Sequence, residues 1–222
     1  FETLSYDQRG LGQSDKPDRP YNMAEYADDA ANLLDIVDWE NCLVMGISFG
    51  GMVAQELALR HPGRVKKLVL GCTASGGAGG SSFPLHEIQD MPLEQKIKFR
   101  MSKNDKRLDE KWQQENPKEF QILFDEAIEN GKFAADEPGH AMGAQRQLEA
   151  RAEHDTYDRL PELKMPVLVC GGKYDGQAEP EVVENLAGRI TGAELAYFEG
   201  GHFFLQQDPA AAKKITDFLL SE

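Results

Sequence analysis

The stretch LVMGISFGGMVAQELALRHP, from Leu43 to Pro62, decides the fold of this chain. It opens with an apolar run typical of a buried strand, turns at one serine set among glycines, and continues with apolar residues at helical spacing. A strand, then Gly46-Ile47-Ser48-Phe49-Gly50, then a helix is the sequence form of a nucleophile elbow, a tight turn that exposes a serine hydroxyl. This five-residue pattern is weak alone, so the groups that activate Ser48 must be found elsewhere in the chain.

Strand and helix signals alternate on both sides of this stretch. A strand is predicted at 1–7, and a helix is predicted from Met23 to about Val37 with Asn22 as its N-cap. Further strands are predicted at 42–47, 65–73, 166–172 and 193–201, and further helices at 51–60, 181–190 and 210–220. Short apolar strands separated by helices predict an α/β fold, with a mostly parallel sheet that helices cover on both faces.

Between the third and fourth of these strands the pattern changes to polar segments after the flexible run ASGGAGGSS. Helical stretches are predicted at 93–101, 117–130 and 141–153. We interpret residues 74–165 as a helical cap inserted into a core sheet domain, whose two parts are 1–73 and 166–222. Because the insertion follows the carboxyl end of a strand, a cap over a pocket is favoured over a solvated decoration. Five aromatic residues are expected mostly to pack the cap's own core: Phe83, Phe99, Trp112, Phe120 and Phe124.

The elbow predicts an acid and then a base along the chain, each just past a later strand. Asp175 follows the strand in PVLVCGGKYDG, and His202 follows the strand in AELAYFEGGHFF. His202 would take the Ser48 proton as general base, and Asp175 would fix the imidazole tautomer and stabilise the imidazolium. The backbone N–H of Phe49, at the start of a helix, is placed to donate to an oxyanion. The chain therefore predicts a catalytic triad of Ser48, Asp175 and His202 with Phe49 in the oxyanion hole.

Other titratable residues compete less well for these roles. Asp208 stands before Pro209 and is expected to begin the last helix, and no carboxylate follows the strand at 65–73. The other histidines do not follow a core strand: His61 ends a helix, and the rest lie in the insertion, at His86, His140 and His154.

Composition excludes several classes of partner and cofactor. The 222 residues carry 24 Lys and Arg against 38 Asp and Glu, a net charge of −14, which would repel a nucleic-acid backbone. No apolar run is long enough to span a membrane and no signal peptide is recognisable, so a cytoplasmic protein is expected. Three cysteines, Cys42, Cys72 and Cys170, are expected to be small buried residues rather than disulfides, and no His and Cys pair has metal-ligand spacing. We expect neither a metal nor a cofactor.

Four segments together resemble the α/β-hydrolase superfamily over nearly the whole chain: YDQRGLGQSDKP from Tyr6, GISFGGMVAQELALRHPGRVKKLVL from Gly46, PVLVCGGKYDG from Pro166 and FEGGHFFLQQDP from Phe198. The runs CTASGGAGGSSFPLHE and QLEARAEHDTYDRLPELKMPVLV are similar to the enol-lactonase-like branch, which includes 3-oxoadipate enol-lactonases. The resemblance implies hydrolysis of a small carboxylic ester or lactone through an acyl-serine, without a cofactor.

The resemblance also assigns roles to residues outside the triad. It implies that the loop with Asp7, Arg9 and Ser14 is structural and that Phe49 donates through its backbone. His154 and Asp155 are expected to be a surface pair of the cap rather than residues that face a substrate.

One departure from the family concerns the beginning of the chain. The family has further strands before the one that matches 1–7, and a His-Gly loop that donates the second oxyanion hydrogen bond; neither is present in this sequence. In the family's sheet order, one strand lies between the strands that match 1–7 and 42–47. Without it, each backbone group of those two strands that finds no hydrogen-bond partner would cost about 1 to 3 kcal/mol. Three explanations remain open: the sequence is a fragment of a longer product, the first strand pairs directly with the Ser48 strand, or another chain supplies the missing strand.

Alternatives to an ester hydrolase also remain open at this point. The same scaffold could hold a small ligand without turning it over, and the same three groups could serve C–C bond hydrolysis or cofactor-free perhydrolysis. The sequence identifies neither the substrate nor the oligomeric state.

Overall fold

The structure, a computed structural model, describes residues 1–132 and 136–221. Its four strands form one sheet in the order β1 (Cys42–Ile47), β2 (Val65–Gly71), β3 (Val167–Gly172) and β4 (Glu194–Phe198). Every neighbouring pair of strands is parallel, so their carboxyl ends all meet at one edge of the sheet. The predicted α/β fold with a parallel sheet is confirmed.

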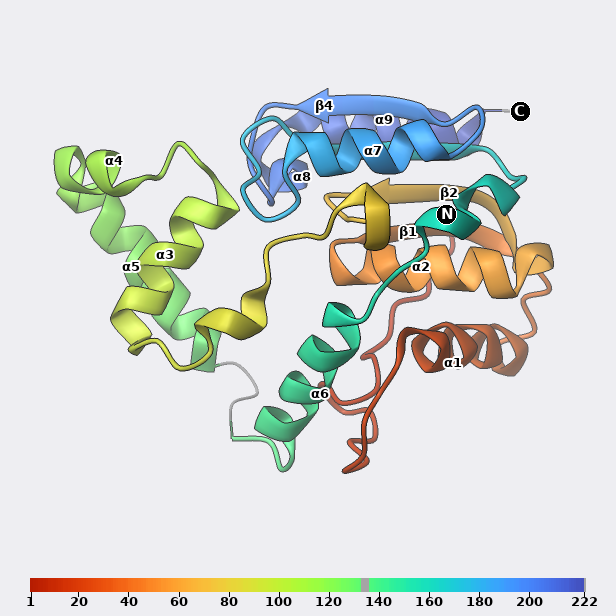
Figure 1. The fold of residues 1–222 in the computed structure, drawn as a ribbon, viewed down its shortest axis with the longest axis horizontal. Helices are drawn as coiled ribbons and strands as arrows, with labels where there is room; N and C mark the ends of the chain where they lie inside the picture. Colours follow the sequence, from red (N-terminus) through yellow and green to blue (C-terminus); the bar gives the residue numbers. More distant parts are fainter. Residues whose placement is uncertain (133–135, 222) are drawn as a thin grey trace.

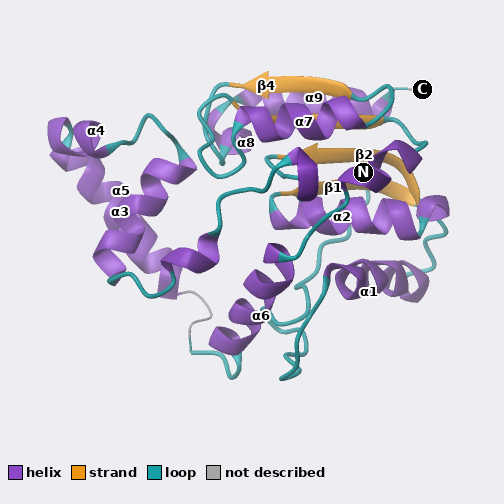
Figure 2. Cartoon of the chain, in the orientation of Figure 1, coloured by secondary structure: helices purple, strands orange, loops and turns teal. Residues whose placement is uncertain are grey.

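Helices cover this sheet and also build a separate group beside it (Figures 1 and 2). They are α1 (Met23–Ile36), α2 (Phe49–Arg60), α3 (Leu93–Asn104), α4 (Glu110–Glu115), α5 (Pro117–Lys132), α6 (His140–Ala152), α7 (Pro180–Arg189), α8 (Phe204–Gln207) and α9 (Pro209–Leu220). In Figure 1, α2 and α7 lie in front of the strands and α9 behind them, while α1 packs on α2. The predicted N-caps are present: the Asn22 side chain accepts from the Glu25 N–H, and the Asp208 side chain accepts from the Ala210 N–H.

The core lies between the two central strands and the helices on their faces. Leu68, Val69 and Leu70 of β2 and Leu168 and Val169 of β3 are completely buried. Residues from both the beginning and the end of the chain complete this core, since α1, α2, α7 and α9 all contribute to the same cluster. Full burial of one such aliphatic side chain stabilises the fold by about 1.5 to 3 kcal/mol, so the strand ends that carry the candidate site stand on a rigid base.

The strand predicted at residues 1–7 is wrong. This segment has no regular structure and is largely exposed, with Phe1 71% accessible. Within the part of the chain that the structure describes, β1 pairs only with β2, so direct pairing of 1–7 with the Ser48 strand is not observed. A strand needs a neighbour for its backbone hydrogen bonds, and without one those groups are solvated by water. The segment instead lines a groove of about 890 Å³ along the free edge of β1.

The segment between β2 and β3 is helical, as expected for a cap. Helices α3, α4 and α5 form a group that projects to the left in Figure 1, whereas α6 lies below the sheet domain. The short helix α4 was not predicted, because six residues are too few for helical spacing to be recognised. All five cap aromatics are half-buried, and four of them pack in pairs, with 5.4 Å between the rings of Phe83 and Phe99 and 5.6 Å between those of Phe120 and Phe124. The division into three domain segments stays a prediction.

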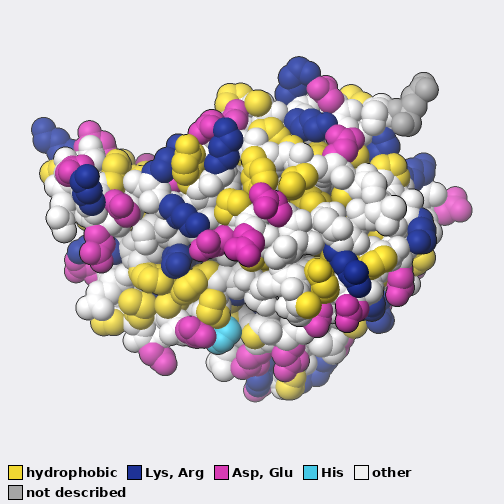
Figure 3. Space-filling view, turned by 45° about the horizontal axis from the view of Figure 1, so that its top comes forward, with side chains coloured by type: hydrophobic (Ala, Val, Ile, Leu, Met, Phe, Trp, Pro, Cys, Tyr) yellow, Lys and Arg dark blue, Asp and Glu magenta, His cyan; other side chains and the backbone are white. Residues whose placement is uncertain are grey.

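Acidic and basic side chains are interspersed on the face that Figure 3 shows, and neither kind forms a continuous field there. Many of them form ion pairs at the surface, such as Lys98 with Glu94 and Lys213 with Asp217. In the ranges that the structure covers, no helix combines the length and the apolar character that crossing a membrane requires.

Candidate active site

Ser48 stands between β1 and α2 in a strained backbone conformation. Its φ of 52° and ψ of −119° lie outside the regions that a serine ordinarily adopts. Close packing around the turn maintains this conformation: a Cβ on Gly46 would lie 2.3 Å from the Gly50 carbonyl oxygen, and a Cβ on Gly51 would lie 2.6 Å from the Thr73 side chain. Thr73 also donates its hydroxyl to the Ser48 carbonyl at 2.8 Å. The turn is therefore the tight, crowded elbow that the glycines predict.

Asp175 follows β3 and His202 follows β4, and the His202 ring lies between Ser48 and Asp175. The His202 Nε2 is 2.9 Å from the Ser48 Oγ, and its Nδ1 is 2.8 Å from the Asp175 Oδ2. Asp175 is completely buried and His202 is only 9% exposed, whereas Ser48 is partly accessible. Since all strands are parallel, three residues far apart in sequence come together at one edge of the sheet.

The second oxygen of Asp175 orients the carboxylate. Its Oδ1 accepts the backbone N–H groups of Gln177 at 2.7 Å and Ala178 at 3.0 Å. A carboxylate only accepts hydrogen bonds, so the His202 Nδ1 carries the ring proton and Nε2 is left to accept from the Ser48 hydroxyl. This arrangement can remove a proton from Ser48 and stabilise the positive charge that results on the ring.

Cys72 lies beside both Asp175 and His202. It follows β2 with a φ of 38°, and its thiol donates to the His202 carbonyl at 3.5 Å. One ligand atom from each of Cys72, Asp175 and His202 lies within 4.8 Å of the others, a spacing that a metal ion could bridge. However, burial raises the pKa of the Cys72 thiol well above its usual value, and the other two residues are hydrogen-bonded to each other. The chemistry of this cluster fits proton transfer better than metal ligation. All three cysteines are free, with Cys72 and Cys170 buried and Cys42 half-buried.

The end of α3 supports the loops that carry the acid and the base, a feature that the sequence analysis missed. The Asn104 carbonyl accepts the His202 N–H at 2.5 Å, and the Asn104 side chain accepts from the Gln177 amide at 2.6 Å. The Lys103 carbonyl accepts the Gly176 N–H at 2.9 Å. No sequence motif predicts which backbone carbonyls at the end of a helix will accept hydrogen bonds from distant loops. Only the tertiary structure therefore identifies the support that α3 gives to the loops of Asp175 and His202.

Phe49 is the first residue of α2, and the first N–H groups of a helix lack an intrahelical partner. Its ring packs edge-on against Tyr26, with 5.0 Å between the ring centroids. The position of its N–H directly after Ser48 is compatible with the predicted oxyanion donor, and that role stays a prediction.

Residues 1–209 match the family model described as alpha/beta hydrolase fold. The chain belongs to this family. The predicted enzyme class, a hydrolase, is confirmed by this membership.

Individual relatives of this α/β hydrolase agree with the family assignment. The chain is 29% identical to a poly(3-hydroxyalkanoate) depolymerase of Ectopseudomonas oleovorans, over 100% of the chain and 76% of the relative. It is 25% identical to 3-oxoadipate enol-lactonase 2 of Acinetobacter baylyi, over 95% of the chain and 75% of the relative. Matches to some other relatives cover only 29% or 27% of those proteins. The crystal structure of the enol-lactonase from Burkholderia xenovorans LB400 superposes with a TM-score of 0.75 at 22% identity, covering 97% of this chain and 80% of that one.

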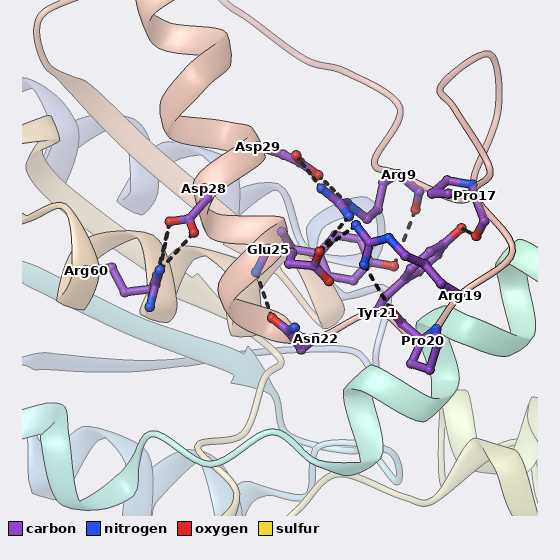
Figure 4. Close-up of polar contacts among 11 residues, drawn as sticks. Arg9, Pro17, Arg19, Pro20, Tyr21, Asn22, Glu25, Asp28, Asp29 and Arg60 are labelled. Atoms are coloured by element: carbon purple, nitrogen blue, oxygen red, sulfur yellow. Dashed lines mark hydrogen bonds and ion pairs between the residues drawn. The ribbon is translucent and has the colours of Figure 1, made fainter.

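The Arg9 loop of this hydrolase joins the segment before α1 to α1 itself (Figure 4). Arg9 donates from Nε and Nη2 to the two carboxylate oxygens of Asp29, at 2.6 and 2.7 Å, and from Nη1 to Glu25 at 3.1 Å. Asp7 and Ser14 bond within the same loop: the Ser14 hydroxyl donates to the Asp7 carbonyl at 2.5 Å. These contacts agree with the structural role that the family resemblance implies.

The remaining histidines lie outside the triad. His61 ends α2 and contacts Asp28, with 2.7 Å between its Nε2 and the carboxylate. The expectation that His154 and Asp155 form a surface pair is wrong, because His154 is only 5% exposed, whereas Asp155 is exposed. His154 lies two residues past the end of α6, and Thr156 just beyond it bonds to Gln55 of α2, a contact that a polar sequence does not reveal.

Proposed function

We propose that this chain is a serine hydrolase that cleaves a small carboxylic ester or lactone through an acyl-enzyme. The observation that carries the proposal is the distance of 2.9 Å between the His202 Nε2 and the Ser48 Oγ, with Asp175 bonded to the other ring nitrogen. Relatives named as a depolymerase of poly(3-hydroxyalkanoate) and as an enol-lactonase support an ester or lactone as the substrate class.

In the first half of the reaction, His202 Nε2 takes the Ser48 proton while Oγ forms a bond to the substrate's carbonyl carbon. The carbonyl oxygen becomes an oxyanion, which the Phe49 N–H stabilises; one such donor is worth about 10² to 10³ in rate. When the tetrahedral intermediate collapses, the carbon–oxygen bond to the leaving alcohol breaks and that alcohol takes the proton from His202. The products of this half are the alcohol and an ester on Ser48; a lactone gives one molecule that carries both.

In the second half, a water molecule attacks the acyl carbon and His202 accepts its proton. The new oxyanion collapses, the bond to Oγ breaks and the proton returns to Ser48. Asp175 stays ionised throughout, because its role is to hold the ring and to stabilise its positive charge. The proton transfers and bond changes of both halves use these side chains and water.

Hydrolysis of p-nitrophenyl acetate by the purified chain tests this proposal. We expect release of p-nitrophenol by the wild type, its loss in Ser48→Ala, and no change in Ser5→Ala, which alters an exposed serine outside the triad. Equal rates for wild type and Ser48→Ala would contradict the mechanism.

A fluorophosphonate probe separates the enzyme from the alternative, a scaffold that binds a ligand without turnover. The probe reacts only with an activated serine hydroxyl. Labelling of wild type and Ser5→Ala, with none of Ser48→Ala, supports the enzyme; an unlabelled, folded wild type supports the scaffold. A panel of aryl esters, enol-lactones and acyl chains of rising length then defines the substrate.

A further inference from the structure

A small cavity of about 180 Å³ lies between the end of α6 and the segment that follows β2. Its walls include Met52 of α2, Gly76 and Ser82, together with Arg151 and His154. Ser48, Asp175 and His202 do not line it, although Met52 is one helical turn along α2 from Ser48. The cavity is therefore distinct from the triad but lies on the same side of α2.

Arg151 is a buried cation in this cavity. It is only 9% exposed, and its Nη2 donates to the Ser82 hydroxyl at 2.7 Å and to the Phe83 carbonyl at 2.8 Å. No carboxylate among residues 1–132 and 136–221 forms an ion pair with it, and burial alone lowers the pKa of its guanidinium. A buried charge without a counterion is costly, so an anion that entered the cavity would be attracted strongly.

His154 offers a second unused polar group beside this guanidinium. It is 5% exposed, and neither ring nitrogen has a hydrogen-bond partner in the described part of the chain. The Ala74 carbonyl faces the ring without reaching hydrogen-bond geometry. Burial lowers the pKa of His154 to about 4, so at neutral pH the ring is uncharged, with one N–H to donate and one nitrogen to accept. Buried polar groups are ordinarily paired, so this unpaired ring indicates a position that a ligand fills.

A buried polar network fixes the walls of the cavity. The Gln55 amide donates to the Ala74 carbonyl at 3.0 Å, and its oxygen accepts from the Thr156 hydroxyl at 2.6 Å. The Thr156 N–H donates to the Ser75 carbonyl at 2.8 Å, while Gly76 packs so closely that a Cβ there would meet the His154 carbonyl oxygen. These contacts join α2, the segment after β2 and the segment after α6, so the cavity is formed before any ligand binds.

We propose that this cavity binds the carboxylate of a small organic acid, with the Arg151 guanidinium as its charge partner and the His154 N–H as a hydrogen-bond donor. Its volume is below the roughly 300 to 1,000 Å³ of pockets for larger ligands, so a single acidic group with a short chain fits. A monoanion is favoured over a phosphate dianion, because Arg151 supplies one positive charge to the cavity. The neighbouring Glu56 does not form a pair with Arg151, because it is already paired with Arg159. Because the two Nη2 hydrogens of Arg151 are taken by Ser82 and Phe83, its Nε or Nη1 would donate one charge-assisted hydrogen bond to the carboxylate.

Butyrate and its neutral isostere butyramide test the binding without any turnover. We expect calorimetric titration of the wild type to detect butyrate and to show binding of butyramide that is weaker by about tenfold or more, since a hydrogen bond to a charged group is lost. Equal binding of the two compounds, or no binding of either, would overturn the proposal. This experiment needs no variant, and it uses no hydrolytic activity, so its failure is separate from failure of the proposed function.

Arg151→Met and Arg146→Met form a matched pair of variants. Both remove one cation from α6, but Arg146 is already paired with Asp18 and Glu149 at the surface. We expect Arg151→Met to weaken butyrate binding by about tenfold or more and Arg146→Met to leave it within about twofold. Ser82→Ala, which removes one hydrogen bond of Arg151 but keeps its charge, should retain binding; loss of binding in all three variants, or in none, would refute the assignment to Arg151.

The bound carboxylate could belong to the substrate itself or to a separate acid, and enzyme kinetics distinguish these two sources. If it belongs to the substrate, Arg151→Met should raise KM for mono-4-nitrophenyl succinate but not for neutral 4-nitrophenyl butyrate, and butyrate should compete with the succinate ester. If it belongs to a separate acid, butyrate should bind without competing with either ester. Both results keep Arg151 as the anion partner, and an equal rise in KM for both esters with unchanged butyrate affinity would remove it from that role.

Discussion

Substitution of Gly46 by alanine is predicted to damage the elbow, whereas the same substitution at Gly50 is not. A Cβ on Gly46 would lie 2.3 Å from the Gly50 carbonyl oxygen and 2.7 Å from the Ala54 Cβ, while a Cβ on Gly50 would meet nothing within 4 Å. Ordinary contacts begin near 3.5 Å, so the backbone at Gly46 must shift by about 1 Å. Overpacking of this kind costs about 1 to 3 kcal/mol, and the groups in contact here are backbone atoms and a buried alanine, which places the cost near the upper end.

Thermal unfolding and ester hydrolysis measure the two consequences. A loss of about 3 kcal/mol corresponds to a decrease in Tm of about 6 to 12 °C for a chain of this size. The shift also displaces Ser48, and misplacement by about 1 Å can cost roughly 10² in rate. Gly50→Ala replaces a glycine of α2 and should be neutral or stabilise the fold by up to about 1 kcal/mol. If Gly46→Ala matched the wild type in Tm, or if the two variants lost equal stability, the steric reasoning would be refuted.

Three further predictions concern charged and titratable groups. Asp175→Asn should lower kcat by about 10⁴, because the amide favours the wrong imidazole tautomer, while the fold persists; circular dichroism and the aryl-ester assay check both. His154 has a folded-state pKa of about 4, below its unfolded value of about 6.5, so the unfolded chain binds the proton first as the pH falls and stability decreases. Urea unfolding should show a loss of about 2 kcal/mol between pH 7 and pH 5 that His154→Gln reduces, and an unchanged loss in this variant would contradict the assignment. Arg9→Lys should cost about 1 kcal/mol of unfolding free energy, because lysine cannot form the paired bonds to Asp29; Arg60→Lys, at a more exposed pair, should cost less than about 0.5 kcal/mol, and equal losses would contradict this distinction.

The sequence by itself determined the sheet, most of its helices and the strand ends at which the acid and base stand. These features follow from local rules: apolar runs of strand length, helical spacing, and caps such as Asn22 and Asp208. The order of Ser48, Asp175 and His202 along the chain was also sufficient to nominate the three residues, because parallel strands bring their carboxyl ends to one edge.

Tertiary structure alone decided what depends on contacts between distant segments. The segment 1–7 has an apolar pattern, but no strand among residues 1–132 and 136–221 pairs with it, so it forms no strand. His154 lies in a polar stretch yet is buried, because the end of α6 turns against α2 and the segment after β2. The support of His202 by the Asn104 carbonyl and the burial of the Arg151 charge are likewise invisible in sequence, since burial and hydrogen bonding are set by which segments meet in space.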